Sequence, residues 1–251
     1  MRLKERPAQP RDRLDVLAQG SILHRALAEW GQVPIFGASI LLQVFEEEVV
    51  KRRIPLGYRT EAVRLELLRH FEAFLRDTQV SLASEVRVEQ DVRFALHPGL
   101  TIRGRIDRLD IGPGKQALVI DYKYSAGDRI REKVEESEEG QRVQAGLYLL
   151  AAEKALKLEP AGMLYCGLRK KVSWSGWHLN RPGLQTVGEA RTREALDELM
   201  EAAHSATLAA HEAILAGRVN AHPRDPDQCK RCDFRDVCRV ETLGAAMEAG
   251  A

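Results

Sequence analysis

Residues 104–123 read GRIDRLDIGPGKQALVIDYK, and this stretch decides the fold. Polar and apolar side chains alternate in its first half, as in a strand with one face in water. The Gly-Pro-Gly sequence at 112–114 predicts a turn, and the apolar run behind it is typical of a central strand. We therefore expect two neighbouring strands joined by a short turn. Asp107 lies on the first strand, and Asp121 and Lys123 end the second.

These charged residues form a candidate catalytic group. Side chains alternate along a strand, so Asp121 and Lys123 share one face and Tyr122 points to the other. If the two strands pair through the turn, Asp107 lies close to Asp121. Two carboxylates beside a lysine suit Mg²⁺ or Mn²⁺, and such a site can hydrolyse a phosphodiester bond. The alternative is a surface salt bridge of little energetic value, but the end of so apolar a strand is an unfavourable place for one.

The rest of the chain alternates between helical and extended patterns. Apolar residues at helical spacing predict three helices in the first third, over residues 20–30, 38–53 and 60–78. Strand patterns follow at 85–96, 100–112, 116–124, 161–171 and 172–179, with helices at 138–158 and 186–217. This order predicts an α/β fold in which a small mixed sheet is flanked by helices. We expect one integrated domain made of a helical part (1–83), a core (84–217) and a cysteine-containing tail (218–251).

Three segments together carry a family resemblance. They are GRIDRLD at 104–110, VIDYKYSAG at 119–127 and QRVQAGLYL at 141–149. In this order and spacing they resemble the PD-(D/E)xK nuclease superfamily, and specifically its RecB/AddB-like exonuclease branch. The resemblance covers roughly residues 20–240 and implies a restriction-endonuclease-like fold. It also implies a metal-dependent nuclease acting on single-stranded DNA or DNA ends, within or beside a helicase–nuclease that serves DNA repair and recombination.

The resemblance assigns roles to the strand residues and to a histidine. Asp107 and Asp121 match the two acidic metal ligands, Lys123 matches the catalytic lysine, and the backbone carbonyl of Tyr122 is implied as a further ligand. His24, in a Gly-x-x-x-His-x-x-Leu pattern, matches a metal-binding histidine. Without the resemblance, a lone histidine on an amphipathic helix is more often a surface or satisfied residue.

Gln144 and Tyr148 match the Q-x-x-x-Y motif of the helix after the catalytic strand. Four residues apart, they lie on one helical face, together with Gln141 one turn earlier. The resemblance places them around the active site and the DNA backbone, whereas the alternative is an ordinary amphipathic face. Glu85 and Glu89 lie on an earlier strand. They either support the metal or lie on a solvent-exposed face of that strand without a functional role.

Three of the four cysteines, Cys229, Cys232 and Cys238, lie within ten residues and suggest a metal site, because soft thiolates select zinc or iron–sulfur clusters. The resemblance implies a structural [4Fe–4S] cluster completed by a cysteine upstream of the histidine helix. Residues 1–23 contain no cysteine, so we expect the chain to be one piece of a longer polypeptide. The alternatives for the fourth ligand are Cys166, which is more typical of core filler, and His222 in a Cys3His zinc site.

The net charge of +1 means that a nucleic-acid partner must be held by local basic patches. Candidate phosphate contacts are Arg103, Arg105, Arg108, Arg129, Arg131, Lys133, Arg169, Lys170 and Lys171. No apolar run approaches the ~20 residues of a membrane helix, and no secretory signal is recognisable, so we expect a cytoplasmic protein. The rival functions are a catalytically inactive DNA-binding scaffold and an RNA-processing nuclease.

Overall fold

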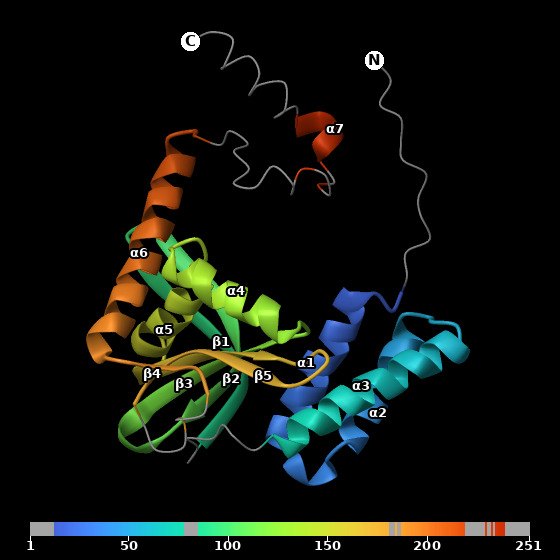
Figure 1. Ribbon diagram of the computed structural model, residues 1–251. Helices are drawn as coiled ribbons and strands as arrows, with labels where there is room; N and C mark the ends of the chain where they lie inside the picture. Colours follow the sequence, from blue (N-terminus) through green and yellow to red (C-terminus); the bar gives the residue numbers. More distant parts are fainter. Residues whose placement is uncertain are drawn as a thin grey trace. The chain divides into compact units, whose positions relative to one another are not determined.

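The computed structural model describes residues 13–77, 85–180, 184, 187–218, 229, 232 and 234–238. Contacts divide the chain into two compact units, Met1–Thr207 and Leu208–Ala251. The helices, labelled in Figure 1, are α1 (Val16–Gln32), α2 (Ser39–Lys51), α3 (Tyr58–Arg76), α4 (Gly127–Glu138), α5 (Gln144–Lys154), α6 (Arg193–Leu215) and α7 (Arg235–Cys238), with 3-10 turns η1 (Pro34–Phe36) and η2 (Pro113–Lys115). The strands are β1 (Glu85–His97), β2 (Leu100–Ile111), β3 (Gln116–Lys123), β4 (Glu159–Gly167), β5 (Ser173–Leu179) and β6 (Glu189–Arg191).

The strands form one six-stranded sheet in the order β1-β2-β3-β4-β5-β6. Strand β3 pairs in parallel with β4, and β5 pairs in parallel with β6, whereas the other neighbours are antiparallel. The sheet is therefore mixed, and the α/β, restriction-endonuclease-like fold class predicted from the sequence is confirmed. The cysteine triple lies in the C-terminal region.

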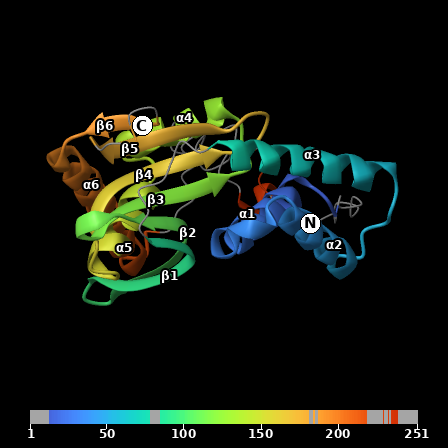
Figure 2. The same ribbon diagram turned by 90° about the horizontal axis from the view of Figure 1, so that it is seen from below.

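Helices cover both faces of this sheet, and each face has its own apolar core. Helices α1, α2 and α3 pack against Leu118, Ile120 and Tyr122 of β3. On the opposite face, α4, α5 and the first turns of α6 pack around Ala117 and Val119 of the same strand. Burial on both faces explains why β3 is a nearly continuous apolar run. In Figure 2, α1, α2 and α3 gather on the side toward which the arrowheads of β3 and β4 point.

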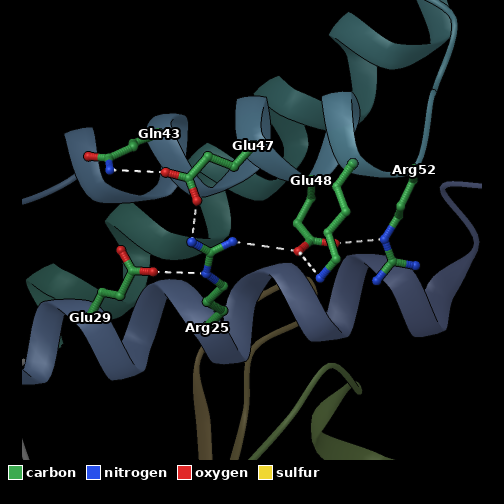
Figure 3. A network of polar contacts seen from close by, with 7 residues as sticks. Arg25, Glu29, Gln43, Glu47, Glu48 and Arg52 are labelled. Carbon is green, nitrogen blue, oxygen red and sulfur yellow. Dashed lines mark hydrogen bonds and ion pairs between the residues drawn. The ribbon is translucent and has the colours of Figure 1, made fainter.

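A polar network attaches α1 to α2 (Figure 3). The guanidinium of Arg25 forms ion pairs with Glu29 on its own helix and with Glu47 on α2, and its Nη1 lies 3.5 Å from Oε1 of Glu48. Glu48 is buried, and it also binds Arg52, with 2.7 Å between Oε2 and Nε. These contacts fix the rotation of α1 about its axis and so fix the direction of its other face.

Two of the expected helices differ from the structure, and one further helix was not expected. The helix predicted over 138–158 is shorter, since α5 runs from Gln144 to Lys154, and α4, which ends at Glu138, was not predicted. Helix α4 has only Ile130, Val134 and Ser137 buried, a stripe too narrow to stand out in so charged a segment. The helix predicted from residue 186 begins at Arg193, because the preceding residues form β6, whose three exposed residues show no alternation.

The predicted turn between β2 and β3 is confirmed. It forms η2, in which Gly114 has φ +68°, a conformation that favours glycine. Among the helices of the described residues, none is long and apolar enough to cross a membrane.

Candidate active site

The last residues of β3 have one open edge. Strand β4 pairs with β3 along its whole length, up to Lys123 opposite Gly167. Strand β2, in contrast, pairs with β3 only as far as Arg108 opposite Ile120. The segment that carries Asp121 and Lys123 therefore has no strand partner on the β2 side. This split between two strands creates the space in which the charged residues meet.

A side chain takes the place of the missing strand. The main-chain N–H of Tyr122 donates a hydrogen bond of 2.9 Å to Oδ2 of Asp107. In an extended strand, the N–H and C=O of one residue point to the same side. The carbonyl of Tyr122 therefore faces the same open edge. The family resemblance of the sequence implies that this carbonyl is a metal ligand.

A kink in β1 and β2 turns Asp107 toward β3. The paired residues pass from Val88 opposite Arg108 to Gln90 opposite Ile106, and the pair between them, Glu89 and Asp107, is not joined in the ladder. Glu89 has φ +48°, an uncommon conformation for a residue with a side chain. Ile106 and Leu109, an odd number of residues apart, belong to the same core, so the regular alternation of β2 is interrupted between them.

Asp121 is buried and incompletely satisfied. Its Oδ1 accepts a hydrogen bond of 3.1 Å from Nε2 of Gln144, and its Oδ2 forms an ion pair with the ammonium of Lys123. That Oδ2 accepts no properly oriented hydrogen bond from the described residues. Burial raises the pKa of Asp121, and the negative charge of Asp107 raises it further, although Lys123 opposes both effects. The site thus concentrates negative charge where little water reaches it.

Helix α1 brings His24 to the same place from the other face of the sheet. Its Nδ1 lies 3.4 Å from Oδ2 of Asp107, and its ring meets the Tyr122 ring edge-on, with 6.2 Å between centroids. Burial alone would lower the pKa of His24, but the hydrogen bond to Asp107 and its charge outweigh that effect, and the pKa is raised. His24, Asp107, Asp121 and Lys123 therefore form one contiguous group.

Gln144 and Tyr148 link α5 to both strands. Besides Asp121, the Gln144 amide donates a hydrogen bond of 3.2 Å to the hydroxyl of Tyr148, which donates one of 2.9 Å to the carbonyl of Arg105. The structure places the predicted pair beside Asp121, which accepts a hydrogen bond from Gln144. The participation of the Arg105 carbonyl was missed, because any residue can supply a carbonyl and the sequence carries no signal for it.

An open cleft of about 830 Å³ lies over this group. One wall is the exposed face of α1, and the other side includes the kink of β1 and β2. Its lining residues are Val16, Leu17, Gly20, Ser21, His24, Arg25, Ala28, Glu29, Gln32, Glu89, Arg105, Asp107, Lys123, Tyr124 and Ser125. The α1 wall was not predicted, although its residues lie at helical spacing from His24 and could have been found from that spacing. Of the two weak acidic candidates, Glu89 lines the cleft, whereas Glu85 is exposed and pairs with Arg87 on its own strand.

The proposed phosphate contacts fall into two groups. Arg108 is buried, and its guanidinium donates hydrogen bonds of 2.6 and 2.8 Å to Asp110, so the expectation that it meets a phosphate is wrong. The burial of Arg108 could not be predicted from the sequence, because the alternation of buried and exposed side chains along β2 is interrupted near this residue. Arg169, Lys170 and Lys171 are exposed.

The four cysteines also divide into one buried residue and three partly exposed residues. Cys166 has no exposed surface and lies in the core between the sheet and α1–α3, where burial raises the pKa of its thiol well above the usual range. Its complete burial among apolar side chains makes Cys166 a core residue, the role that is typical of a free cysteine in an apolar strand. Cys229, Cys232 and Cys238 are partly exposed, and none forms a disulfide. His222 lies outside the described residues.

No three His, Cys, Asp or Glu side chains within the described ranges converge as a preformed metal cage. The carboxylates of Asp107 and Asp121 are instead held by donors of the chain itself, namely the Tyr122 N–H, Gln144 and Lys123.

One of three comparisons with known proteins identifies the family. The family model of the PD-(D/E)XK nuclease superfamily matches residues 1–239. A search of curated proteins gave no match. Among solved structures, the crystal structure of SSO0001 is similar at a TM-score of 0.37 and 14% identity, over 87% of this chain and 83% of that chain. Because the family match spans nearly the whole chain, this protein belongs to the PD-(D/E)XK nuclease superfamily and is a metal-dependent nuclease.

Proposed function

We propose that this nuclease hydrolyses phosphodiester bonds in single-stranded DNA or at DNA ends, in the manner of RecB-like exonucleases. The observation that carries the proposal is the meeting of His24, Asp107, Asp121, Lys123 and Gln144 at the open end of β3. These residues come from α1, β2, β3 and α5, and an ordinary surface salt bridge would not require such convergence. The cleft above them gives a substrate access to the group.

The residues present fit Mg²⁺ or Mn²⁺. The buried Oδ2 of Asp121 contacts the Lys123 ammonium but accepts no well-oriented hydrogen bond from the described residues, and Asp107 adds a second carboxylate close by. Carboxylate and carbonyl oxygens are the ligands that these hard cations prefer. Asp107, Asp121, the carbonyl of Tyr122 and the imidazole of His24 would hold the ion. The chemistry supplied on binding is polarisation of the phosphate and activation of water.

The remaining residues have separate roles in this proposal. Lys123, half-buried beside Asp121, orients the attacking water and stabilises the negative charge that develops on the phosphate. Gln144 holds Oδ1 of Asp121, and Tyr148 holds Gln144. Both α5 residues touch the site through the chain itself, so we assign them positioning roles.

A cleavage assay tests the proposal. End-labelled single-stranded DNA, duplex DNA and RNA are incubated with Mg²⁺ or Mn²⁺ and with wild-type protein, Asp121→Asn or Lys123→Ala. The matched controls are Asp197→Asn and Lys154→Ala, which alter an aspartate and a lysine at the helix surface. We expect single-stranded DNA to be degraded by wild type and by both controls, and to be left intact by the two site variants.

The other outcomes are equally informative. Cleavage that survives in Asp121→Asn would overturn the assignment of the site. Binding of DNA without cleavage by wild type would favour a scaffold, and preferential cleavage of RNA would favour RNA processing. A readout independent of activity is the melting temperature: Mn²⁺ should raise it in wild type and not in Asp121→Asn, because only ligand bound to the folded state stabilises it.

We also infer that Cys229, Cys232 and Cys238 hold a structural [4Fe–4S] cluster in the intact protein. The inference is supported by their spacing and by their partial exposure, which leaves the thiols accessible to a ligand. Iron and sulfide analysis and the visible spectrum of anaerobically purified protein test it. Stoichiometric zinc without a chromophore would instead support a zinc site. A helicase partner and a role in repair are proposals that rest only on the resemblance of the motifs to the RecB-like branch.

A further inference from the structure

We propose that the turn after β4 binds the phosphate backbone of the nucleic-acid strand that occupies the cleft. This turn consists of Leu168, Arg169, Lys170 and Lys171, and is called the basic turn below. The inference rests on the proposed function, because it assigns a second contact surface to the same substrate.

The basic turn is joined by its main chain to the end of the catalytic strand. The N–H of Leu168 donates a hydrogen bond of 2.9 Å to the carbonyl of Lys123, and the N–H of Arg169 donates one of 3.1 Å to the carbonyl of Ser125. Lys123 and Ser125 both line the cleft. The main chain of the turn is therefore held beside Lys123 and Ser125, two residues that line the cleft.

Two further contacts stabilise the conformation of the turn. The N–H of Lys170 donates a hydrogen bond of 3.2 Å to Nε2 of His70 on α3, and the N–H of Lys171 donates one of 3.0 Å to the Arg169 carbonyl. Lys170 has φ +71°, which is uncommon for a residue with a side chain. The main chain of the turn is thus held by contacts to α3 and within the turn, and the side chains of Arg169, Lys170 and Lys171 are exposed.

The charge of the basic turn is available, whereas that of the cleft arginines is not. Arg25 is bound by Glu29, Glu47 and Glu48 (Figure 3). Arg105 is bound by Glu89 and Asp91, at 3.1 and 2.9 Å. Each of these arginines already has more than one carboxylate partner, so neither offers a free cation to a phosphate.

None of the ion pairs found among the described residues involves Arg169, Lys170 or Lys171, and all three are exposed. Arg69 on α3, next to His70, is also exposed and forms no ion pair there. The Arg169 guanidinium lies 5.7 Å from the centroid of the Tyr124 ring, a cation–π contact that places it against a cleft residue. Glu66 is the carboxylate that faces Tyr124 and His70 from α3.

A row of uncompensated cations fits the phosphodiester backbone. Such contacts neutralise phosphates without reading bases, and their strength falls with salt. No exposed aromatic side chain accompanies the basic turn, since Tyr124 is buried, so base stacking does not contribute there. We therefore expect binding that is independent of sequence and steeply dependent on ionic strength.

The test measures binding without cleavage. In an Asp121→Asn background, the affinity for fluorescein-labelled single-stranded oligo-dT is measured by anisotropy across a salt series. The test variant carries Arg169→Ala, Lys170→Ala and Lys171→Ala. The matched control carries Lys115→Ala, Lys154→Ala and Lys157→Ala, three exposed lysines near the opposite ends of β3 and β4. The net charge changes equally, and Lys115 and Lys157 share the positive φ of Lys170.

We expect the basic-turn variant to bind about 10- to 100-fold more weakly at 0.1 M salt. Its slope of log affinity against log salt should be smaller by about two, since each phosphate contact to a single strand contributes about 0.7. The control should keep the affinity and slope of its parent. An equal loss in the control, or no loss in the basic-turn variant, would overturn the inference.

Two additional measurements keep the result interpretable. If the triple-alanine variant has a lower melting temperature than its parent, the same three positions are changed to glutamine. Glutamine keeps most of the side-chain length and removes the charge. Cleavage is assayed separately with Asp121 restored. Cleavage by wild type with unchanged binding by the basic-turn variant would refute the basic turn alone. A parent that does not bind DNA, together with a wild-type protein that does not cleave it, would refute the proposed function as well.

Discussion

Replacing Tyr148 by phenylalanine should lower the turnover of this nuclease while leaving its substrate affinity nearly unchanged. The change removes only the hydroxyl, which accepts a hydrogen bond from Gln144 at 3.2 Å and donates one to the carbonyl of Arg105 at 2.9 Å. The ring stays in place against Gly104. The variant therefore isolates the connection between α5 and the two strands.

The magnitude follows from those two hydrogen bonds. Each contributes about 0.5–1.5 kcal/mol net, and because Tyr148 is half-exposed, water replaces part of what is lost. We expect a loss of stability of about 1 kcal/mol, which lowers the melting temperature by about 2–4 °C in a chain of this size. Gln144 then orients Oδ1 of Asp121 less firmly, and a similar loss in the transition state corresponds to a roughly fivefold to tenfold lower kcat.

The assay is steady-state cleavage of labelled single-stranded DNA at saturating Mn²⁺, together with thermal unfolding. Tyr58→Phe serves as the control, because Tyr58 is 92% exposed and also loses only a hydroxyl. Gln144→Ala and the double variant complete a mutant cycle. If Tyr148 acts through Gln144, the double variant should be no slower than Gln144→Ala. A Tyr148→Phe protein with wild-type kcat, or strictly additive effects, would refute the reasoning.

Three further predictions concern stability. Gly31→Ala should destabilise the fold by about 1–3 kcal/mol, because a Cβ at this position would lie 2.5 Å from Cγ1 of Val88, and Gly31→Ala combined with Val88→Ala should recover much of the loss in thermal unfolding. Cys166→Ser should melt earlier than Cys166→Ala, since it places a hydroxyl in a dry core, and neither should change the iron or zinc content of the protein. Burial lowers the pKa of His70, aided by Arg69 and Arg169 and opposed by Glu66, so the unfolded chain binds protons more readily than the folded one. The free energy of unfolding should therefore keep its full value above about pH 6.5 and decrease below it. In denaturant titrations at a series of pH values, His70→Gln should show a smaller decrease than wild type. An equal decrease in the two proteins would contradict this account.

The sequence predicted the centre of this site better than its surroundings. Asp121 and Lys123 could be placed because they end the most apolar strand, and Gln144 and Tyr148 because a four-residue spacing on a helix puts them together. Asp107 was expected to approach Asp121 through strand pairing. The structure brings it there by the opposite route, through the end of pairing between β2 and β3.

What could not be predicted depends on backbone irregularities and long-range contacts. The positive φ of Glu89 has no signature in a residue type that rarely adopts it. The sequence predicted Arg108 as a surface cation. It is instead a buried partner of Asp110, because the alternation of buried and exposed side chains in β2 is interrupted. Helix α4 was missed because its buried stripe is narrow. In each case a tertiary contact decides the outcome, and a single sequence contains no record of such contacts.

The hydrogen bond from Tyr122 to Asp107 also affects how inactive variants should be chosen. A strand edge with unpaired main-chain groups is a template for pairing with other chains, and natural proteins often protect such edges with charge. Asp107 provides that protection at the open end of β3, in addition to facing the cleft. Substituting it would leave the Tyr122 N–H at this strand edge without its partner, so poor expression or aggregation of an Asp107 variant could be mistaken for loss of catalysis. The side chains of Asp121 and Lys123 point away from that edge. Substituting either of them should therefore remove activity while the hydrogen bond between Tyr122 and Asp107 stays in place.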